Sequence, residues 1–151
     1  MRYKLPAILW TAFIFLASSD AFSAPHTGSI LQSIAVFVLG HPLSDTTYEL
    51  AHLTIRKLAH LTEYGILGYL WFRAVRREEP GWTMRWSVTA VLIAIAVAAA
   101  DETHQAFVPS RTASPLDVLI DTCGAVLAQL AVFHHRRPSP PPRGGEGAAG
   151  G

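Results

Sequence analysis

The chain has 151 residues, of which 50% are hydrophobic and 15% are charged, and its formal net charge is +1. Soluble domains usually have about a quarter of their residues charged, so this composition indicates a small integral membrane protein. The arginines gather at the ends of apolar segments and do not follow one helix face. This distribution excludes the basic stripe of a nucleic-acid-binding protein.

Four apolar segments approach the length of roughly 20 residues that a helix needs to cross about 30 Å of hydrocarbon. They comprise residues 5–17 with an extension toward 22, residues 55–72, residues 82 to about 105, and residues 115–133. A shorter apolar run at 30–39 predicts a re-entrant or interfacial helix, and residues 45–54 predict a short helix leading into the second span. The expected fold is therefore all-α: a polytopic membrane helix bundle of about four transmembrane helices plus this short re-entrant or interfacial helix.

Basic residues indicate how these spans are oriented. They lie before the first span, between the second and third, and after the fourth: Arg2, Lys4, Arg73, Arg76, Arg77, Arg85, Arg136, Arg137 and Arg143. Four alternating helices place all of them on one side, which the positive-inside rule makes the cytoplasm. Trp82 and Trp86 suit the same membrane interface. We therefore expect a multi-pass protein of the cytoplasmic (inner) membrane, with both termini in the cytoplasm.

The two ends of the chain carry separate expectations. The first span also resembles a secretory signal peptide, because a basic start and an apolar stretch precede Ala21-Phe22-Ser23 and then Ala24; its removal would leave three spans. Residues 1–135 are predicted to form one transmembrane domain. Residues 136–151, rich in proline and glycine, are predicted to be a disordered cytoplasmic tail. The single cysteine, Cys123, excludes an internal disulfide and is expected to be a buried hydrophobic residue.

Ionisable residues occur where a membrane protein rarely places them. Each costs roughly 2.5–3.5 kcal/mol in the middle of a membrane helix, so such groups are kept for a function or for one another. They fall in residues 56–64 and 101–121, and the predicted orientation puts both stretches in the outer leaflet or at its surface. The predicted catalytic residues are His60, Glu63, Glu102, His104, Asp117 and Asp121. The predicted substrate-binding residues are Arg56, Lys57, Tyr64, Asp101, Gln105 and Arg111. Small residues, Gly65, Gly68, Gly124 and Ala128, predict close packing of the second and fourth spans.

Some of these residues also have a structural interpretation. Arg56 and Lys57 could be interface anchors, and Asp117 could be a residue that favours a helix start. Asp121 and Glu63 lie deeper in their spans, where the structural alternative is a buried ion network. The histidines His60 and His104, near several carboxylates, also allow a divalent metal site, although no close ligand spacing is present. The cofactor therefore stays open.

Two motifs resemble those of the VanZ-like family. Residues 56–68, RKLAHLTEYGILG, are similar to its first motif, and residues 101–111, DETHQAFVPSR, followed by Asp117, Asp121 and Gly124, are similar to its second. The resemblance covers about residues 5–133 and implies a small polytopic membrane protein. It points to Lys57, His60, Glu63, Tyr64, Glu102, Gln105, Arg111, Asp117 and Asp121 as the polar positions. Two residues depart from the pattern: Leu61 replaces a frequent aromatic, and Asp121 stands where many members have Asn.

The family's founding member is associated with low-level resistance to teicoplanin, a phenotype that depends on a gene-cluster context. Two functions from different classes remain open for this chain. As an enzyme, it would hydrolyse or transfer a phosphate-linked head group of a membrane lipid, either a phospholipid or a polyprenyl-linked cell-envelope precursor. Arg56, Lys57 or Arg111 would hold the phosphate, and His60 or His104 would transfer protons. As a binding protein, it would bind or mask such a head group or a cell-wall precursor without chemistry, in glycopeptide resistance or envelope homeostasis.

Overall fold

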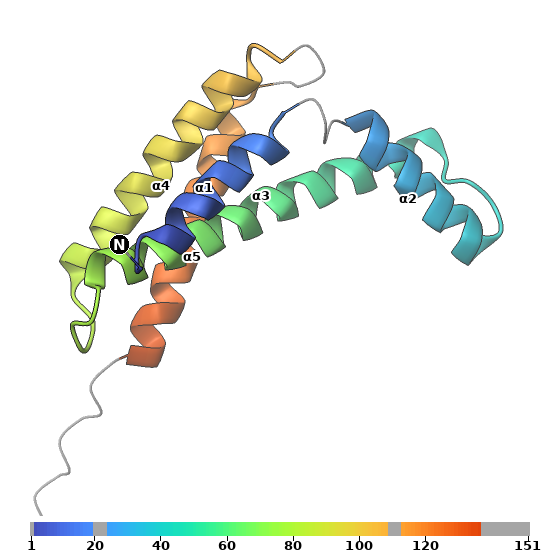
Figure 1. The fold of residues 1–151 in the computed structure, drawn as a ribbon. Helices are drawn as coiled ribbons and strands as arrows, with labels where there is room; N and C mark the ends of the chain where they lie inside the picture. Colours follow the sequence, from blue (N-terminus) through green and yellow to red (C-terminus); the bar gives the residue numbers. More distant parts are fainter. Residues whose placement is uncertain (1, 20–23, 109–112, 137–151) are drawn as a thin grey trace, which may run out of the picture.

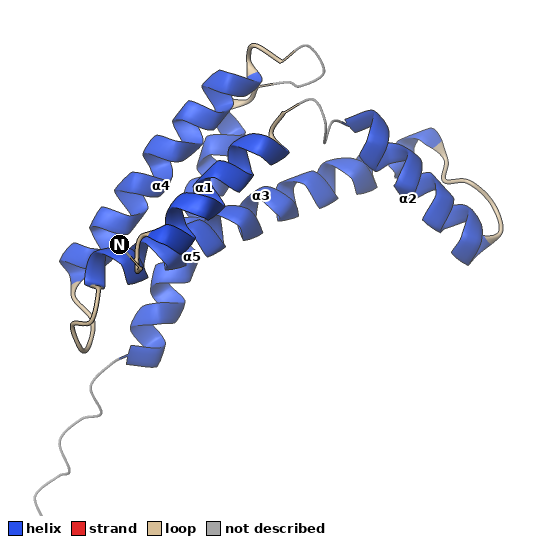
Figure 2. Cartoon of the chain, viewed as in Figure 1, coloured by secondary structure: helices blue, strands red, loops and turns tan. Residues whose placement is uncertain are grey.

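The computed structural model describes residues 2–19, 24–108 and 113–136, and all regular structure within these ranges is helical (Figure 2). The helices are α1 (Leu5–Ala17), α2 (Ala24–Leu39), α3 (Asp45–Arg76), α4 (Met84–Gln105) and α5 (Pro115–Arg136). The predicted all-α class is confirmed. Residue 136 of the predicted tail belongs to α5, and the rest of that tail lies outside the described residues.

Helix boundaries follow from local capping chemistry. Ser44 caps α3 by accepting a hydrogen bond from the Thr47 amide at 3.4 Å, and Thr83 caps α4 in the same way from Trp86 at 3.5 Å. A proline stands in the first turn of α1 and another opens α5, where its fixed φ favours the helical start. The predicted start of the fourth span at residue 115 is therefore confirmed.

Two of the described helices are long and apolar enough to cross a membrane: Met84–Gln105, with mean hydropathy 1.5, and Pro115–His135, with 1.7. The expectation of about four transmembrane helices is thus met in part. Helix α1 has 13 residues, or roughly 20 Å at 1.5 Å per residue, which is less than the hydrocarbon thickness. Helix α3 has 32 residues, but its charged positions lower its hydropathy. The short helix predicted at 45–54 is the first part of α3 and not a separate element, so the predicted boundary at residue 55 is wrong.

The helices alternate in direction. The start of α1 contacts the end of α3, because Arg2 approaches Glu78 at 3.4 Å, whereas Ser18 at the end of α1 bonds Asp101 near the end of α4 at 2.9 Å. Helix α4 therefore runs with α1. Helices α3 and α5 run with each other and against α4, and all four lie side by side in Figure 1. One end of this bundle carries the basic residues that flank the predicted spans, and the opposite end carries most of the predicted site, including Arg56 and Lys57.

Small residues set the distance between the central helices. A methyl group placed on Gly124 of α5 would lie 2.2 Å from the Leu61 carbonyl oxygen of α3, and one on Gly68 would lie 3.0 Å from Ala125 Cα. The backbones of α3 and α5 therefore touch, as the glycines predicted. Cys123 on the same helix is exposed, so its expected burial was wrong: the small residues of α5, not the cysteine, face the core.

Helix α2 and the first part of α3 form an arm that projects from the bundle (Figure 1). The arm is held by Gln32, whose Oε1 accepts a hydrogen bond from the Leu43 amide at 3.0 Å. Its apolar side chains are exposed, with Phe37 at 90% and Val38 at 68%. The helix predicted at 30–39 is therefore present over the longer range Ala24–Leu39, and its interfacial or re-entrant position stays a prediction.

Candidate functional site

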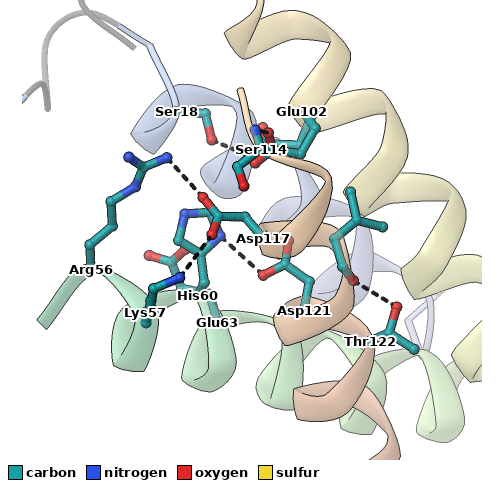
Figure 3. Close-up of polar contacts among 12 residues, drawn as sticks. Ser18, Arg56, Lys57, His60, Glu63, Glu102, Ser114, Asp117, Asp121 and Thr122 are labelled. Atoms are coloured by element: carbon teal, nitrogen blue, oxygen red, sulfur yellow. Dashed lines mark hydrogen bonds and ion pairs between the residues drawn. The ribbon is translucent and has the colours of Figure 1, made fainter. Parts of the chain in front are cut away.

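Polar side chains from four helices meet at one end of the bundle. The end of α1, the middle of α3, the end of α4 and the first half of α5 supply them (Figure 3). Nine of them, all on α3, α4 or α5, form what we call the polar cluster: Arg56, Lys57, His60, Tyr64, Asp101, Glu102, Gln105, Asp117 and Asp121. Six of its nine members are buried polar or charged residues, and Tyr64 is fully buried. Nine of the twelve predicted site residues are therefore brought together.

Two cations and one carboxylate form the rim of the polar cluster. Arg56 Nη2 lies 2.9 Å from Asp117 Oδ2, and Lys57 Nζ lies 3.7 Å from Asp117 Oδ1. The side chains of Arg56 and Lys57 are 25% and 42% exposed, whereas that of Asp117 is 7% exposed. A single buried carboxylate thus holds two cations whose side chains remain partly exposed.

A histidine–carboxylate pair lies one helical turn further in. His60 Nδ1 is 3.0 Å from Asp121 Oδ1, and the two side chains are 10% and 1% exposed. An ionised carboxylate only accepts hydrogen bonds, so the pair is formed when His60 Nδ1 carries the hydrogen. In the neutral ring this leaves Nε2 as the nitrogen that accepts a proton. The arrangement is that of a general base oriented by a carboxylate.

The opposite wall of the polar cluster belongs to α4. Asp101 Oδ2 accepts hydrogen bonds from Ser18 Oγ and from Gln105 Nε2, each at 2.9 Å. Glu102 Oε2 accepts one from the Ser114 amide at 2.6 Å, just before α5 begins. These contacts fix the end of α4 to both α1 and α5.

Comparison with known proteins adds one finding. The family model described as VanZ/LLP1 matches residues 4–134. This chain belongs to the VanZ/LLP1 family. No curated protein and no solved structure matches it. The match covers both motifs, so the polar cluster lies inside the VanZ/LLP1 region, and the family together with the two apolar helices indicates a membrane protein.

Three predicted site residues of this VanZ/LLP1 protein are not members of the polar cluster, although Glu63 lies beside His60 in Figure 3. His104 is exposed on α4, and its ring faces Phe15 with centroids 6.1 Å apart. Glu63 is half-buried on α3, and its backbone carbonyl accepts a hydrogen bond from Trp10 Nε1 at 2.9 Å. Arg111 lies outside the described residues. The roles predicted for these three stay predictions.

Sequence reasoning missed two polar partners of the site, the Ser18 hydroxyl and the Ser114 amide. Both stand where a helix ends or begins. Neither carries a sequence signal of its own, because serine is common at such positions. They could be identified only from the structure, as the donors to Asp101 and Glu102.

The hypothesis of a divalent metal site stays a prediction. Among the described residues, no group of three or more His, Cys, Asp or Glu side chains is placed to hold a metal ion. His60 and His104, the two histidines considered together, lie on different helices, and only His60 is buried.

Proposed function

We propose that this VanZ/LLP1 protein binds the phosphate-linked head group of a lipid at the outer leaflet of the cytoplasmic membrane and hydrolyses or transfers it. The observation that carries the proposal is the position of the buried His60–Asp121 pair directly beneath a partly exposed pair of cations, Arg56 and Lys57. The cations suit a phosphate, and the histidine suits proton transfer beside it.

The chemistry follows from these positions. Arg56 and Lys57 would hold the non-bridging oxygens of the phosphate, with Arg111 as a further predicted ligand. His60 Nε2 would take the proton of a water or alcohol while that oxygen bonds to phosphorus. The phosphorus–oxygen bond to the leaving group then breaks, and His60 returns the proton to the leaving oxygen. Asp121 would keep the imidazole in the required tautomer throughout.

We further propose that α1, α3, α4 and α5 cross the cytoplasmic membrane in alternation, with the polar cluster outside and both termini inside. Their alternating directions support this topology, as does the gathering of basic residues at the opposite end of the bundle. Because α1 is shorter than the hydrocarbon layer, the bilayer would thin locally around it, or the neighbouring helices would shield its ends.

Cysteine labelling tests this topology. Cys123 is exposed on α5, so Cys123→Ala gives a cysteine-free background. Thr103→Cys, near the polar cluster, is expected to react with a membrane-impermeant maleimide in intact spheroplasts. Glu79→Cys, in the connection between α3 and α4, is expected to react only after permeabilisation. Equal labelling of both positions, or the reverse order, would contradict the proposed orientation.

A lipid profile by mass spectrometry tests the reaction. Cells without the protein are compared with cells that express the wild type, His60→Gln, or the matched control His134→Gln at equal membrane levels. His134 is exposed at the far end of α5. A lipid that changes with the wild type and the control is expected to change about 10²–10⁴-fold more slowly with His60→Gln. If the loss follows His104→Gln instead, the assignment to His60 is wrong.

Binding without chemistry is the second candidate function. It is favoured by the burial of His60, which is 7% exposed and so has little access to bulk water. In that case the lipid profile would be the same in all strains. The purified protein would still bind the head group, and Lys57→Gln would weaken that binding.

A further inference from the structure

Five buried oxygen atoms of the polar cluster receive no hydrogen bond from the described part of the protein. They are Tyr64 Oη, Asp101 Oδ1, Glu102 Oε1, Gln105 Oε1 and Asp121 Oδ2. Their residues are between 0% and 7% exposed. A buried polar group without a partner costs about 1–3 kcal/mol, so five in one place are a costly arrangement for a purely structural site.

These oxygens belong to one region. Gln105 donates to Asp101 on the same helix, and Asp121 accepts from His60. Tyr64 packs in one buried cluster with Ala98 of α4 and Ala125 of α5, which lie one helical turn from Asp101 and from Asp121. Tyr64 and Gln105 matter most here, because they are not acids and are 0% and 1% exposed. The unpaired oxygens therefore converge from α3, α4 and α5.

The chemistry of the missing partner follows from this set. Carboxylate and amide oxygens are acceptors, so four of the five atoms require hydrogen-bond donors. The charges point the same way. Asp117 pairs at the rim with Arg56 and Lys57, and Asp121 pairs with His60, whereas Asp101 and Glu102 form no ion pair with the described residues. A compact cation with several N–H groups satisfies both demands, and a primary ammonium carries three such donors.

We propose that this inner part of the polar cluster is a subsite for a primary ammonium group, carried on the same head group whose phosphate lies at Arg56 and Lys57. The ligand class is then a zwitterion in which a short linker joins phosphate to ammonium, as in phosphoethanolamine. Asp121, whose Oδ2 is one of the unpaired oxygens, lies four residues in from Asp117 at the rim, or roughly 6 Å at 1.5 Å per residue, so the linker between phosphate and ammonium need only be short. The inference rests on the proposed function, since it presupposes phosphate at the rim.

Native mass spectrometry of the full chain in detergent tests the subsite. Three phospholipids with identical acyl chains compete at equal concentration: phosphatidylethanolamine, phosphatidylcholine and phosphatidylglycerol. Phosphatidylcholine keeps the positive charge but has no N–H, and phosphatidylglycerol keeps the phosphate but has no ammonium. Diacylglycerol, which has no phosphate, is the fourth ligand. The wild type is expected to retain phosphatidylethanolamine about tenfold over the other two phospholipids, as charge-assisted hydrogen bonds predict.

Variants connect this preference to the inner oxygens. Asp101→Asn keeps the size of the side chain and an acceptor for Ser18 and Gln105, and is expected to bring the preference for phosphatidylethanolamine close to onefold. Glu49→Gln, a matched change on the exposed arm, is expected to leave the preference at its wild-type value. Lys57→Gln is expected to lower retention of all three phospholipids together. Soluble O-phosphoethanolamine, added as a competitor, shows whether the free head group or the lipid is the ligand.

Each outcome is decisive. Preference for phosphatidylethanolamine that is lost in Asp101→Asn supports the ammonium subsite, whichever source of the head group wins. Equal retention of the three phospholipids above diacylglycerol overturns the subsite but leaves the proposed function standing. A preference for phosphatidylethanolamine that Asp101→Asn does not change also overturns the subsite and leaves the proposed function standing. Retention that does not depend on phosphate or on Lys57 overturns both the ammonium subsite and the proposed function.

Discussion

Gly124→Ala is expected to separate α3 from α5 and to cause a larger loss of stability than the same change at Gly65 or Gly68. The added carbon would lie 2.2 Å from the Leu61 carbonyl oxygen and 3.1 Å from the Gly65 amide nitrogen. Backbone atoms cannot turn away as a flexible side chain can, so the helices must move apart. We expect a loss of about 3 kcal/mol, at the upper end of the range for overpacking.

The measurement is thermal denaturation of the detergent-solubilised protein, followed by the fraction that stays monodisperse. Gly65→Ala is the matched control, because the same methyl there would meet Gly124 at an ordinary 3.5 Å. It is expected to lower the midpoint by a small fraction of the effect of Gly124→Ala. Equal midpoints for the two variants would show that the contact between α3 and α5 is not as close as described.

Asp121→Leu is expected to abolish lipid conversion, by about 10²–10⁴-fold, while Asp121→Asn stays within about tenfold of the wild type. Leucine has a similar size but cannot accept the hydrogen bond of His60 Nδ1, which would then be buried without a partner. Asparagine keeps an acceptor oxygen at that place. It is also the residue that many VanZ-like sequences have there, according to the resemblance.

The two variants are compared at equal membrane levels by the rate of change of the lipid found for the wild type. Bound lipid is measured in parallel, because both keep Arg56 and Lys57 at the rim. If Asp121→Asn is as inactive as Asp121→Leu, the charge of Asp121 is required and not merely its acceptor. If neither loses activity, His60 does not depend on Asp121 and the proposed proton transfer through it is wrong.

Hydropathy and capping were sufficient to predict α4 and α5 nearly to their ends, because both are long apolar runs with a clear start. The course of α3 was not predicted. Its polar first part suggested a separate short helix, yet residues 45–64 contain neither proline nor glycine to interrupt it. Polarity there marks the arm that leaves the bundle and does not mark a break in the helix.

The residues of the polar cluster could be predicted, but their pairing could not. Helical spacing placed Arg56 and His60 on one face of α3, and Asp117 and Asp121 on one face of α5. Which cation meets which carboxylate depends on how far the helices are shifted along each other, and spacing within one helix does not contain that distance. Ser18 and Ser19 likewise offer the same signal in sequence, and only the packing of α1 on α4 selects Ser18 as the partner of Asp101.

The contact at Gly124 fixes the register of the two helices. Because the charges on α3 and α5 repeat every four residues, the ion pairs alone would tolerate a slip of one turn: Arg56 could meet Asp121, or His60 could meet Asp117. The first slip would bring Ala128 opposite the Leu61 carbonyl, and the second would bring Ile120. Each side chain would place a Cβ where only hydrogen fits. One glycine thus sets the register of α3 and α5, and the contact between His60 and Asp121 is aligned by a residue that has no functional side chain.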